Sequence, residues 1–196
     1  MALEFDESEH RYSLDGVVLP SVTTVINAIL PQWQADQWAM DRGTATHHGC
    51  RLLDEGRLDW SSVDPEIEPR IRAWQKFRRE FPSEVIANEQ RVFSAQHRFA
   101  GAVDRILEFK GGDVCVCDLK NSVSPQVVLQ LAAYSLAWTI GGGRKPIRAV
   151  AVELLETAEY RCHWFSKHEL RRAEQQFLAV LTVFNFAREH NLLRKI

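Results

Sequence analysis

The chain has 196 residues, a formal net charge of −2, 45% hydrophobic and 26% charged residues. These are values of a globular protein with a substantial core, and they exclude a protein that binds nucleic acid through bulk positive charge. No apolar run approaches the ~18 residues of a membrane span, and the acidic N-terminus does not resemble a secretory or transit signal. We therefore expect a cytoplasmic protein that does not bind membranes.

The four cysteines are Cys50, Cys115, Cys117 and Cys162. They contain no C-x-x-C pair, which argues against a zinc or iron–sulfur site. Cys115 and Cys117 share one face of a predicted strand and cannot easily form a bridge. We expect buried thiols in a reducing compartment.

The N-terminal residues predict a β-hairpin followed by a short helix. Weakly alternating apolar residues over 3–19 surround the turn Asp15-Gly16. Ser21 is a good N-cap for a helix over 22–30, which Pro31 is expected to end.

A second helix is predicted over 34–55, with Gly56 as its stop signal. Gly43 and Gly49 lie inside it, and each costs about 1 kcal/mol relative to alanine. Their presence indicates close approach by another backbone or by a substrate.

A third helix is predicted from the N-cap Asp64 and Pro65 to about residue 81. Its apolar residues form one stripe, made of Ile67, Ile71, Trp74 and Phe77. Its basic residues lie largely outside that stripe, namely Arg70, Arg72, Lys76, Arg78 and Arg79.

Three strands are predicted next, over 85–93, 98–109 and 114–121, and Gly111-Gly112 forms the turn between the last two. The remaining elements are a helix capped by Ser124-Pro125 that ends at Gly141, strands over 147–155 and 160–165, and a helix opened by the capping box Ser166 to Glu169. This order predicts an α/β or α+β fold with a central mixed sheet flanked by helices. No linker divides the chain, so we expect a single domain over 1–196, with the hairpin and first helices in 1–81 and the catalytic sheet in 82–196.

Charged residues interrupt the apolar pattern of two neighbouring strands. Asp104 lies within one strand, and Asp118 and Lys120 close the next. Such charges cost several kcal/mol in a buried strand unless they are paired or bind metal. Residues i and i+2 share a strand face, so Asp118 and Lys120 project together and Asp104 can reach the same point. Converging carboxylates repel unless a cation lies between them, and oxygen ligands suit Mg²⁺ or Mn²⁺.

Lys120 beside such an ion can orient water, accept its proton or neutralise developing phosphorane charge. Gln130 and Tyr134 follow at i and i+4 on one helix face and can hold a phosphate or a base. The alternatives are a surface salt bridge at a strand end for D-x-K, and a half-buried tyrosine with a glutamine partner.

Together these motifs resemble the PD-(D/E)XK nuclease superfamily, and within it the RecB-type branch. The resemblance rests on R-G-T-A-T-H over 42–47, G-A-V-D over 101–104, D-L-K over 118–120 and Q-x-x-x-Y over 130–134. The stretch 12–26 resembles the start of phage-type and mitochondrial genome-maintenance exonucleases. Val103 replaces the proline of the superfamily name, and the four-cysteine cluster of some relatives is absent from this sequence.

The resemblance implies a restriction-endonuclease-like core and a Mg²⁺- or Mn²⁺-dependent deoxyribonuclease in a bacterial or phage-encoded setting. An exonuclease of recombination, replication or repair is favoured over an endonuclease, acting on single- or double-stranded DNA with a recombination or replication protein as a further partner. Its implied metal ligands are His47, Asp104, Asp118, the Leu119 carbonyl and, as a supporting or second-metal residue, Glu89. Lys120 would activate water, whereas Gln130 and Tyr134 would shape the site. His48 lies about 100° round the helix from His47 and is not the expected ligand.

DNA contacts are predicted at basic side chains, with Trp74 or Trp38 as stacking surfaces. The basic candidates are Arg42, Arg70, Arg72, Lys76, Arg78 and Arg79. A solvated helix face over a core stripe is the alternative for the residues of the third helix, and Arg144, Lys145 and Arg148 are equally ambiguous. Two other readings of the whole chain remain: a catalytically inactive nucleic-acid-binding accessory protein with the same fold, and a structural or regulatory protein with a coincidental charge cluster.

Overall fold

The structure is a computed structural model that describes residues 2–7, 9, 11–30 and 37–193. The predicted helix stop at Pro31 and the predicted helical residues 34–36 lie outside the described residues. Within the described part of the chain, no helix is long and apolar enough to cross a membrane.

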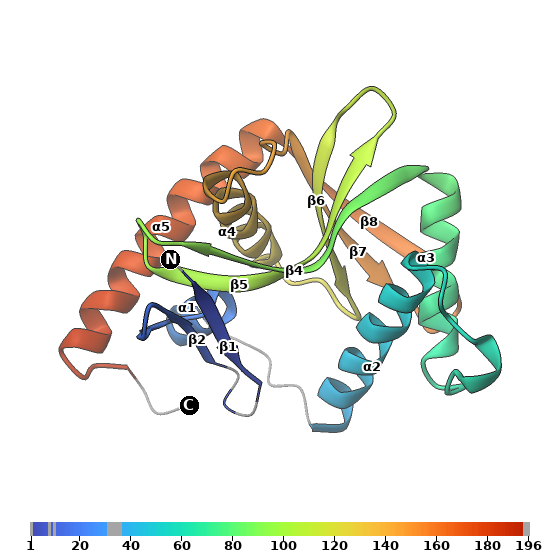
Figure 1. The fold of residues 1–196 in the computed structure, drawn as a ribbon, viewed down its shortest axis with the longest axis horizontal. Coiled ribbons are helices and arrows are strands. Elements are labelled where there is room, and N and C mark those ends of the chain that lie inside the picture. The colour runs from blue at the N-terminus through green and yellow to red at the C-terminus, as the bar shows by residue number, and fades with distance from the viewer. Residues whose placement is uncertain (1, 8, 10, 31–36, 194–196) are drawn as a thin grey trace.

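A five-stranded mixed sheet forms the centre of the molecule (Figure 1). Its strands, in spatial order, are β4 (Ser83–Ser94), β5 (Phe99–Phe109), β6 (Val114–Lys120), β7 (Arg148–Leu154) and β8 (Tyr160–Ser166). Only the β6–β7 pair is parallel, and α4 (Val127–Ile140) connects these two strands. The predicted mixed α/β architecture is therefore confirmed.

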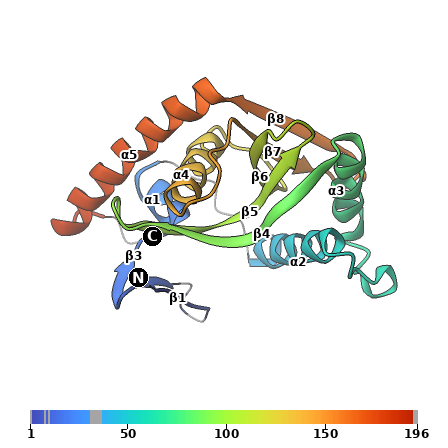
Figure 2. The ribbon, with the colours of Figure 1, turned by 45° about the horizontal axis from the view of Figure 1, so that its top comes forward.

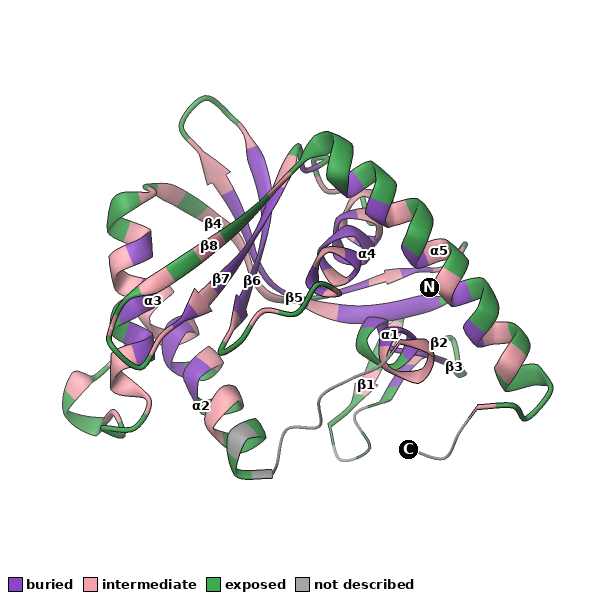
Figure 3. Cartoon of the chain, turned by 180° about the vertical axis from the view of Figure 1, so that it is seen from behind, coloured by how far each residue is buried: buried purple, intermediate pink, exposed green. Residues whose placement is uncertain are grey.

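Helices cover both faces of the sheet (Figures 1 and 2). On one face α1 (Val22–Ile29), α4 and α5 (Lys167–Glu189) share a hydrophobic core with the sheet. On the other face α2 (Gln37–Asp54) and α3 (Glu68–Glu80) pack on a second core, after the short 3₁₀ turn η1 (Trp60–Ser62). The sequence of β6 fits this layering, because its valines face one core and its cysteines face the other, so both faces of the strand are apolar. Figure 3 shows β6, β7 and much of β5 as buried.

The N-terminal residues form a separate small sheet of β1 (Leu3–Asp6), β2 (Arg11–Leu14) and β3 (Val17–Leu19). The predicted turn at Asp15-Gly16 joins β2 to β3, and both residues have positive φ, 47° and 80°. The Ala100 N–H donates to the Pro20 carbonyl at 3.0 Å, which ties this sheet to β5. In Figure 2 it lies beside β5, on the side away from α5.

Most predicted helix ends are confirmed, and two are wrong. Ser21 caps α1 and Ser166 forms the capping box of α5, as predicted. The Asp64 carboxylate, however, accepts from the Glu66 N–H at 2.8 Å within a turn, and α3 begins only at Glu68. Ser124 likewise precedes a turn, and the N-cap of α4 is Gln126. In both places a turn with its own backbone hydrogen bonds comes before the helix. The polar residue that begins this turn resembles a helix cap, so the predicted helix starts too early in the chain.

Of the two glycines inside α2, one allows a close contact, and that contact is with a side chain rather than with another backbone. A Cβ at Gly49 would lie 2.3 Å from Ile71 Cδ1, so this glycine lets α2 and α3 approach each other. At Gly43 a Cβ would make an ordinary contact with Asn121 Nδ2 at 3.6 Å. All four cysteines are free, and all except the half-buried Cys162 are buried, as predicted.

Candidate active site

The candidate site lies where β5 and β6 separate. Their ladder runs from Glu108–Val114 to Arg105–Cys117, and Asp104 and Asp118 come next on the two strands. The Leu119 N–H donates to Asp104 Oδ2 at 2.7 Å. The carboxylate thus takes the place of a main-chain partner at the fork, which explains how a charged group is tolerated in this buried strand.

Three side chains from three elements converge beside this fork. His47 of α2, Glu89 of β4 and Asp104 of β5 each offer one ligand atom, and these atoms lie within 4.8 Å of one another. His47 Nδ1 is 3.5 Å from Asp104 Oδ2 and 4.0 Å from Glu89 Oε1. An imidazole and two carboxylates are a donor set that suits Mn²⁺ and Mg²⁺. Of the predicted ligands, the structure therefore brings His47, Glu89 and Asp104 together, whereas His48 is exposed and contacts Arg51.

Glu89 reaches the cluster through an unusual backbone conformation. Its φ is +49°, in the left-handed region that non-glycine residues seldom adopt, although it lies in the middle of a strand. Its neighbours Asn88 and Gln90 pair with Arg105 and Val103, so Glu89 stands opposite Asp104. Strain of this kind costs of order 1–3 kcal/mol and is typical of functional positions.

The guanidinium of Arg105, the residue after Asp104 on β5, holds the Glu89 carboxylate. Arg105 is fully buried, and its Nη1 donates to Glu89 Oε1 at 2.9 Å and to the Asp104 carbonyl at 2.7 Å. Its Nε donates to Asp54 Oδ2 at 2.6 Å, at the C-terminal end of α2. Asp54, 2% exposed, also accepts from Trp74 Nε1 at 3.1 Å. The sequence interpretation missed Asp54 and Arg105, and the available signal was an arginine inside an otherwise apolar strand.

Asp118 is buried beside Asp104 and only partly satisfied. Its Oδ2 is 2.7 Å from Lys120 Nζ, while its Oδ1 accepts no hydrogen bond from any described residue. Burial, partly offset by Lys120, raises the pKa of Asp118 to about 6. A buried, orphaned carboxylate oxygen next to the His47–Glu89–Asp104 group is what a divalent cation site requires, so the residues present fit such an ion. The ion pair with Lys120 corresponds to the alternative reading of D-x-K, but its carboxylate is buried rather than at the surface.

The charges of the cluster shift the pKa of its members in different directions. Burial disfavours the ionised form of Asp104, but His47 and Lys120 outweigh it and lower the pKa of this carboxyl. Burial and the neighbouring Asp104 raise the pKa of Glu89. Burial would lower the pKa of His47, yet Asp104 raises it overall. Protonated His47 and ionised Asp104 thus stabilise each other's charge.

Gln130 and Tyr134 lie one turn apart on α4, and Tyr134 lies near Asp118 and Asp104. Gln130 Nε2 donates to the Tyr134 hydroxyl at 3.1 Å. Burial, followed by the nearby Asp118, raises the pKa of Tyr134, so its phenol is neutral and lies within the field of the carboxylates. A Cβ at Gly101 would lie 2.7 Å from Tyr134 Cε1, so only glycine leaves room for the ring there.

Some of the residues predicted to contact DNA are buried, and others are exposed. Trp74 is fully buried and Arg70 only 5% exposed, so the predictions of Trp74 as a stacking surface and of Arg70 outside the stripe are wrong. The reason is the second core, where α3 packs against α2 and β7 and buries more than one stripe. Trp38 is exposed and lies 3.9 Å from the Arg42 guanidinium, centroid to Cζ.

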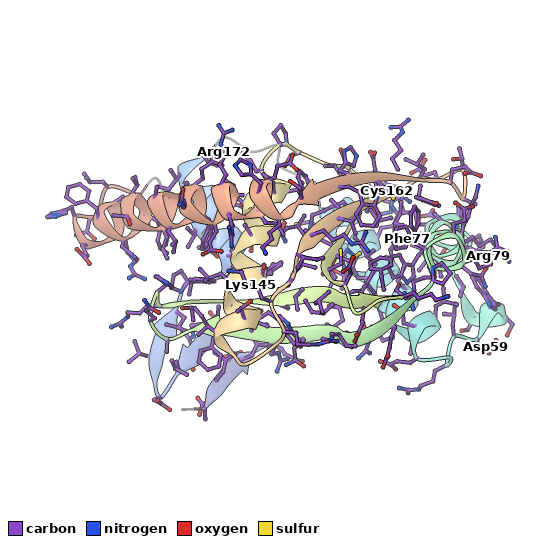
Figure 4. The ribbon with its side chains drawn as sticks, turned by 90° about the horizontal axis from the view of Figure 1, so that it is seen from above. Asp59, Phe77, Arg79, Lys145, Cys162 and Arg172 are labelled. Carbon is purple, nitrogen blue, oxygen red and sulfur yellow. The ribbon has the colours of Figure 1, made fainter. Side chains whose placement is uncertain are left out.

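The other basic candidates lie away from the cluster or pair locally. Arg79 is exposed on the outer side of α3, and Lys145 lies in the loop before β7 (Figure 4). The pairs are Arg72 with Glu68, Lys76 with Glu159, Arg78 with Asp54, Arg144 with Glu108, and Arg148 with Asp113.

A solved structure of another protein shares the fold of this chain. It is a candidate exonuclease from Eubacterium rectale, with a TM-score of 0.52 and 8% sequence identity over 83% of this chain and 71% of that chain. The chain has the fold of that protein. LHK-Exo in complex with dAMP gives 0.45 at 13% identity over 88% and 90% of the two chains, and the alkaline exonuclease LHK-Exo from Laribacter hongkongensis gives 0.41 at 12% over 87% and 92%. No protein-family model and no curated protein matches the sequence.

Proposed function

We propose that the protein is a divalent-metal-dependent deoxyribonuclease, acting as an exonuclease in recombination, replication or repair. The observation that carries the proposal is the convergence of His47, Glu89 and Asp104 beside Asp118, whose buried Oδ1 has no partner among the described residues. The motif resemblance and the fold shared with a candidate exonuclease support the same reading. The preference for exonuclease over endonuclease rests on the motif resemblance.

His47, Glu89, Asp104 and Asp118 would hold the ion, with the Leu119 carbonyl as a further predicted ligand. When bound, a Mg²⁺ or Mn²⁺ ion supplies Lewis acidity toward a phosphoryl oxygen and lowers the pKa of water. In the proposed reaction a water oxygen forms a bond to phosphorus, and the bond from phosphorus to the leaving sugar oxygen breaks. The attacking water releases a proton to solvent, and the leaving sugar oxygen takes one up from solvent.

Lys120 acts in this proposal as a cation. Burial opposes its charge, but Asp118 and Asp104 raise its pKa, so the amine stays protonated beside them. A protonated Nζ orients water through its N–H donors and stabilises negative charge that develops on the phosphoryl oxygens. Tyr134, which is neutral and accepts a hydrogen bond from Gln130, would form the wall of the site on the α4 side.

The test is an assay with Mg²⁺ or Mn²⁺ on end-labelled single strands, linear duplex and closed circles. We expect linear substrates to be degraded and circles to survive; cutting of circles would refute a strict exonuclease. Lys120→Ala and Asp118→Ala should each abolish cleavage while the protein stays folded, and Lys110→Ala, at the exposed far turn of the same hairpin, should not. Full activity of either site variant would overturn the mechanism, and DNA binding without metal binding would favour the inactive accessory protein.

A further inference from the structure

Two arginines from different helices face one carboxylate beside the candidate site. Arg70 Nη2 of α3 is 2.7 Å from Glu156 Oε1, and Arg42 Nη1 of α2 is 3.7 Å from the same atom. Glu156 lies in the loop between β7 and β8, and its side chain is 66% exposed. One largely exposed carboxylate thus faces two guanidinium groups whose side chains are mostly buried.

Both guanidinium groups contain buried nitrogen atoms that have no hydrogen-bond partner among the described residues. The Arg70 side chain is 6% exposed, and its Nε and Nη1 donate to no described residue. Arg42 Nε is also buried without a partner among the described residues. Two largely buried guanidinium groups, with three donor atoms that have no partner among the described residues, therefore share a single carboxylate, an arrangement that favours a further or larger anion.

This position lies at the same edge of the sheet as the proposed catalytic residues. Lys120 on β6 is in register with Glu153 on the parallel strand β7, and Glu156 follows three residues later. Gly43, next to Arg42, approaches Asn121, which directly follows Lys120. Arg42 also precedes His47 by five residues on α2, roughly 7.5 Å along the helix axis.

We propose that Arg42 and Arg70 bind a phosphate group of the nucleic-acid strand and that the Glu156 carboxylate occupies this site until the strand displaces it. The identity of the strand rests on the proposed nuclease function, whereas the phosphate site itself does not. Bidentate guanidinium groups match phosphate geometry, and Trp38, stacked on Arg42, offers an exposed aromatic face for an adjacent base.

The first experiment titrates the metal-free protein, held in EDTA, with inorganic phosphate and follows the arginine Nε–H signals by NMR. We expect saturable shifts of Arg42 and Arg70, with Arg72, paired to Glu68 on α3, as the unchanged reference. Glu156→Gln should tighten phosphate binding roughly threefold to tenfold, because it removes a competing charge. Glu159→Gln is the matched control, since Glu159 lies in the same loop but pairs with Lys76. Equal behaviour of the two glutamine variants, or no response of Arg42 and Arg70, would overturn the proposal.

The second experiment measures binding of oligonucleotides with a 5′-phosphate, a 3′-phosphate or only hydroxyl ends, again in EDTA. Preference for one phosphorylated end, lost in Arg42→Gln, would assign the site to a terminal phosphate. Equal binding of all three oligonucleotides would instead assign the site to an internal phosphodiester. In that case the slope of log affinity against log salt concentration should be smaller by about one in Arg42→Gln. No change in either quantity would overturn the site. Arg42→Gln is preferred to Arg70→Gln because Arg42 is less buried and its loss disturbs the core less.

Failure of this inference is distinguishable from failure of the proposed nuclease function. Phosphate binding is measured without a metal and without cleavage, so it stands if no substrate is ever cut. Lys120→Ala should abolish cleavage yet leave the phosphate-induced shifts of Arg42 and Arg70 intact. If the protein cleaves DNA but phosphate does not shift the NMR signals of its arginines, the proposed phosphate site would be refuted and the proposed nuclease function would stand.

Discussion

Replacement of Asp118 by asparagine should make the metal-free protein more stable at neutral pH. The Asp118 carboxyl is 1% exposed, its Oδ1 has no partner among the described residues, and burial raises its pKa from 3.8 to about 6. A rise of about two pKa units corresponds to roughly 3 kcal/mol. Ionisation of Asp118 destabilises the native state by this amount relative to the unfolded chain. An amide of the same shape avoids that cost and can donate a hydrogen bond.

The pH dependence gives the sign of the effect. Below pH 4 the carboxyl is protonated in both the folded and unfolded states, so it carries no penalty there. Between pH 4 and 6 the unfolded chain ionises first, and the stability of the wild-type protein relative to Asp118→Asn falls. Above pH 6 the whole penalty is present. The loss of the partner of Lys120 opposes the gain, but the Lys120 side chain is 29% exposed and its amine retains Asp104 nearby.

The assay is urea denaturation of both proteins in EDTA at pH 4.5, 6 and 7.5. We expect the free energy of unfolding of Asp118→Asn relative to wild type to rise by roughly 2 kcal/mol between pH 4.5 and 7.5. Manganese should then stabilise the wild-type protein and not the variant, because a ligand that binds only the native state raises its stability. A variant that is less stable than wild type at pH 7.5, or a difference that is independent of pH, would refute the reasoning and favour a structural ion pair.

Three further predictions concern residues around the site. Asp54→Asn leaves buried Arg105 without its carboxylate and should lower the free energy of unfolding by about 3–5 kcal/mol and Mn²⁺ affinity by roughly 10–100-fold, as checked by denaturation and calorimetry. Gly101→Ala should displace the Tyr134 ring and reduce cleavage at a cost of about 1–3 kcal/mol in stability, so an unchanged turnover rate would contradict this packing. Ser166→Ala should cost about 1 kcal/mol through the cap of α5 and leave cleavage unchanged, and a loss of cleavage would contradict its purely local role.

Local patterns in the sequence determined the elements and part of the candidate site. Period-2 and period-3.6 apolar spacing located the strands and helices, because each residue's face is set by its neighbours in the chain. The Gly111-Gly112 turn, for the same reason, fixed Asp104 and Asp118 on adjacent strands. His47 was reached only through motif resemblance, since nothing in its own helix indicates a partner 57 residues away.

Only the tertiary structure decided what surrounds these residues. Asp54 and Arg105 are separated by 51 residues, and their contact depends on the packing of α2 against α3 and β4, which no local pattern encodes. The same packing buries Trp74 and Arg70, which a helical wheel divides into stripe and surface, because α3 contacts both a helix and the sheet. Glu89 enters the cluster through a left-handed φ that its residue type disfavours. The sequence thus determined which groups carry charge and on which strand faces they lie, while long-range packing decided which of those charges meet and which stay unpaired, because pairing depends on distances that arise only when separate elements come together.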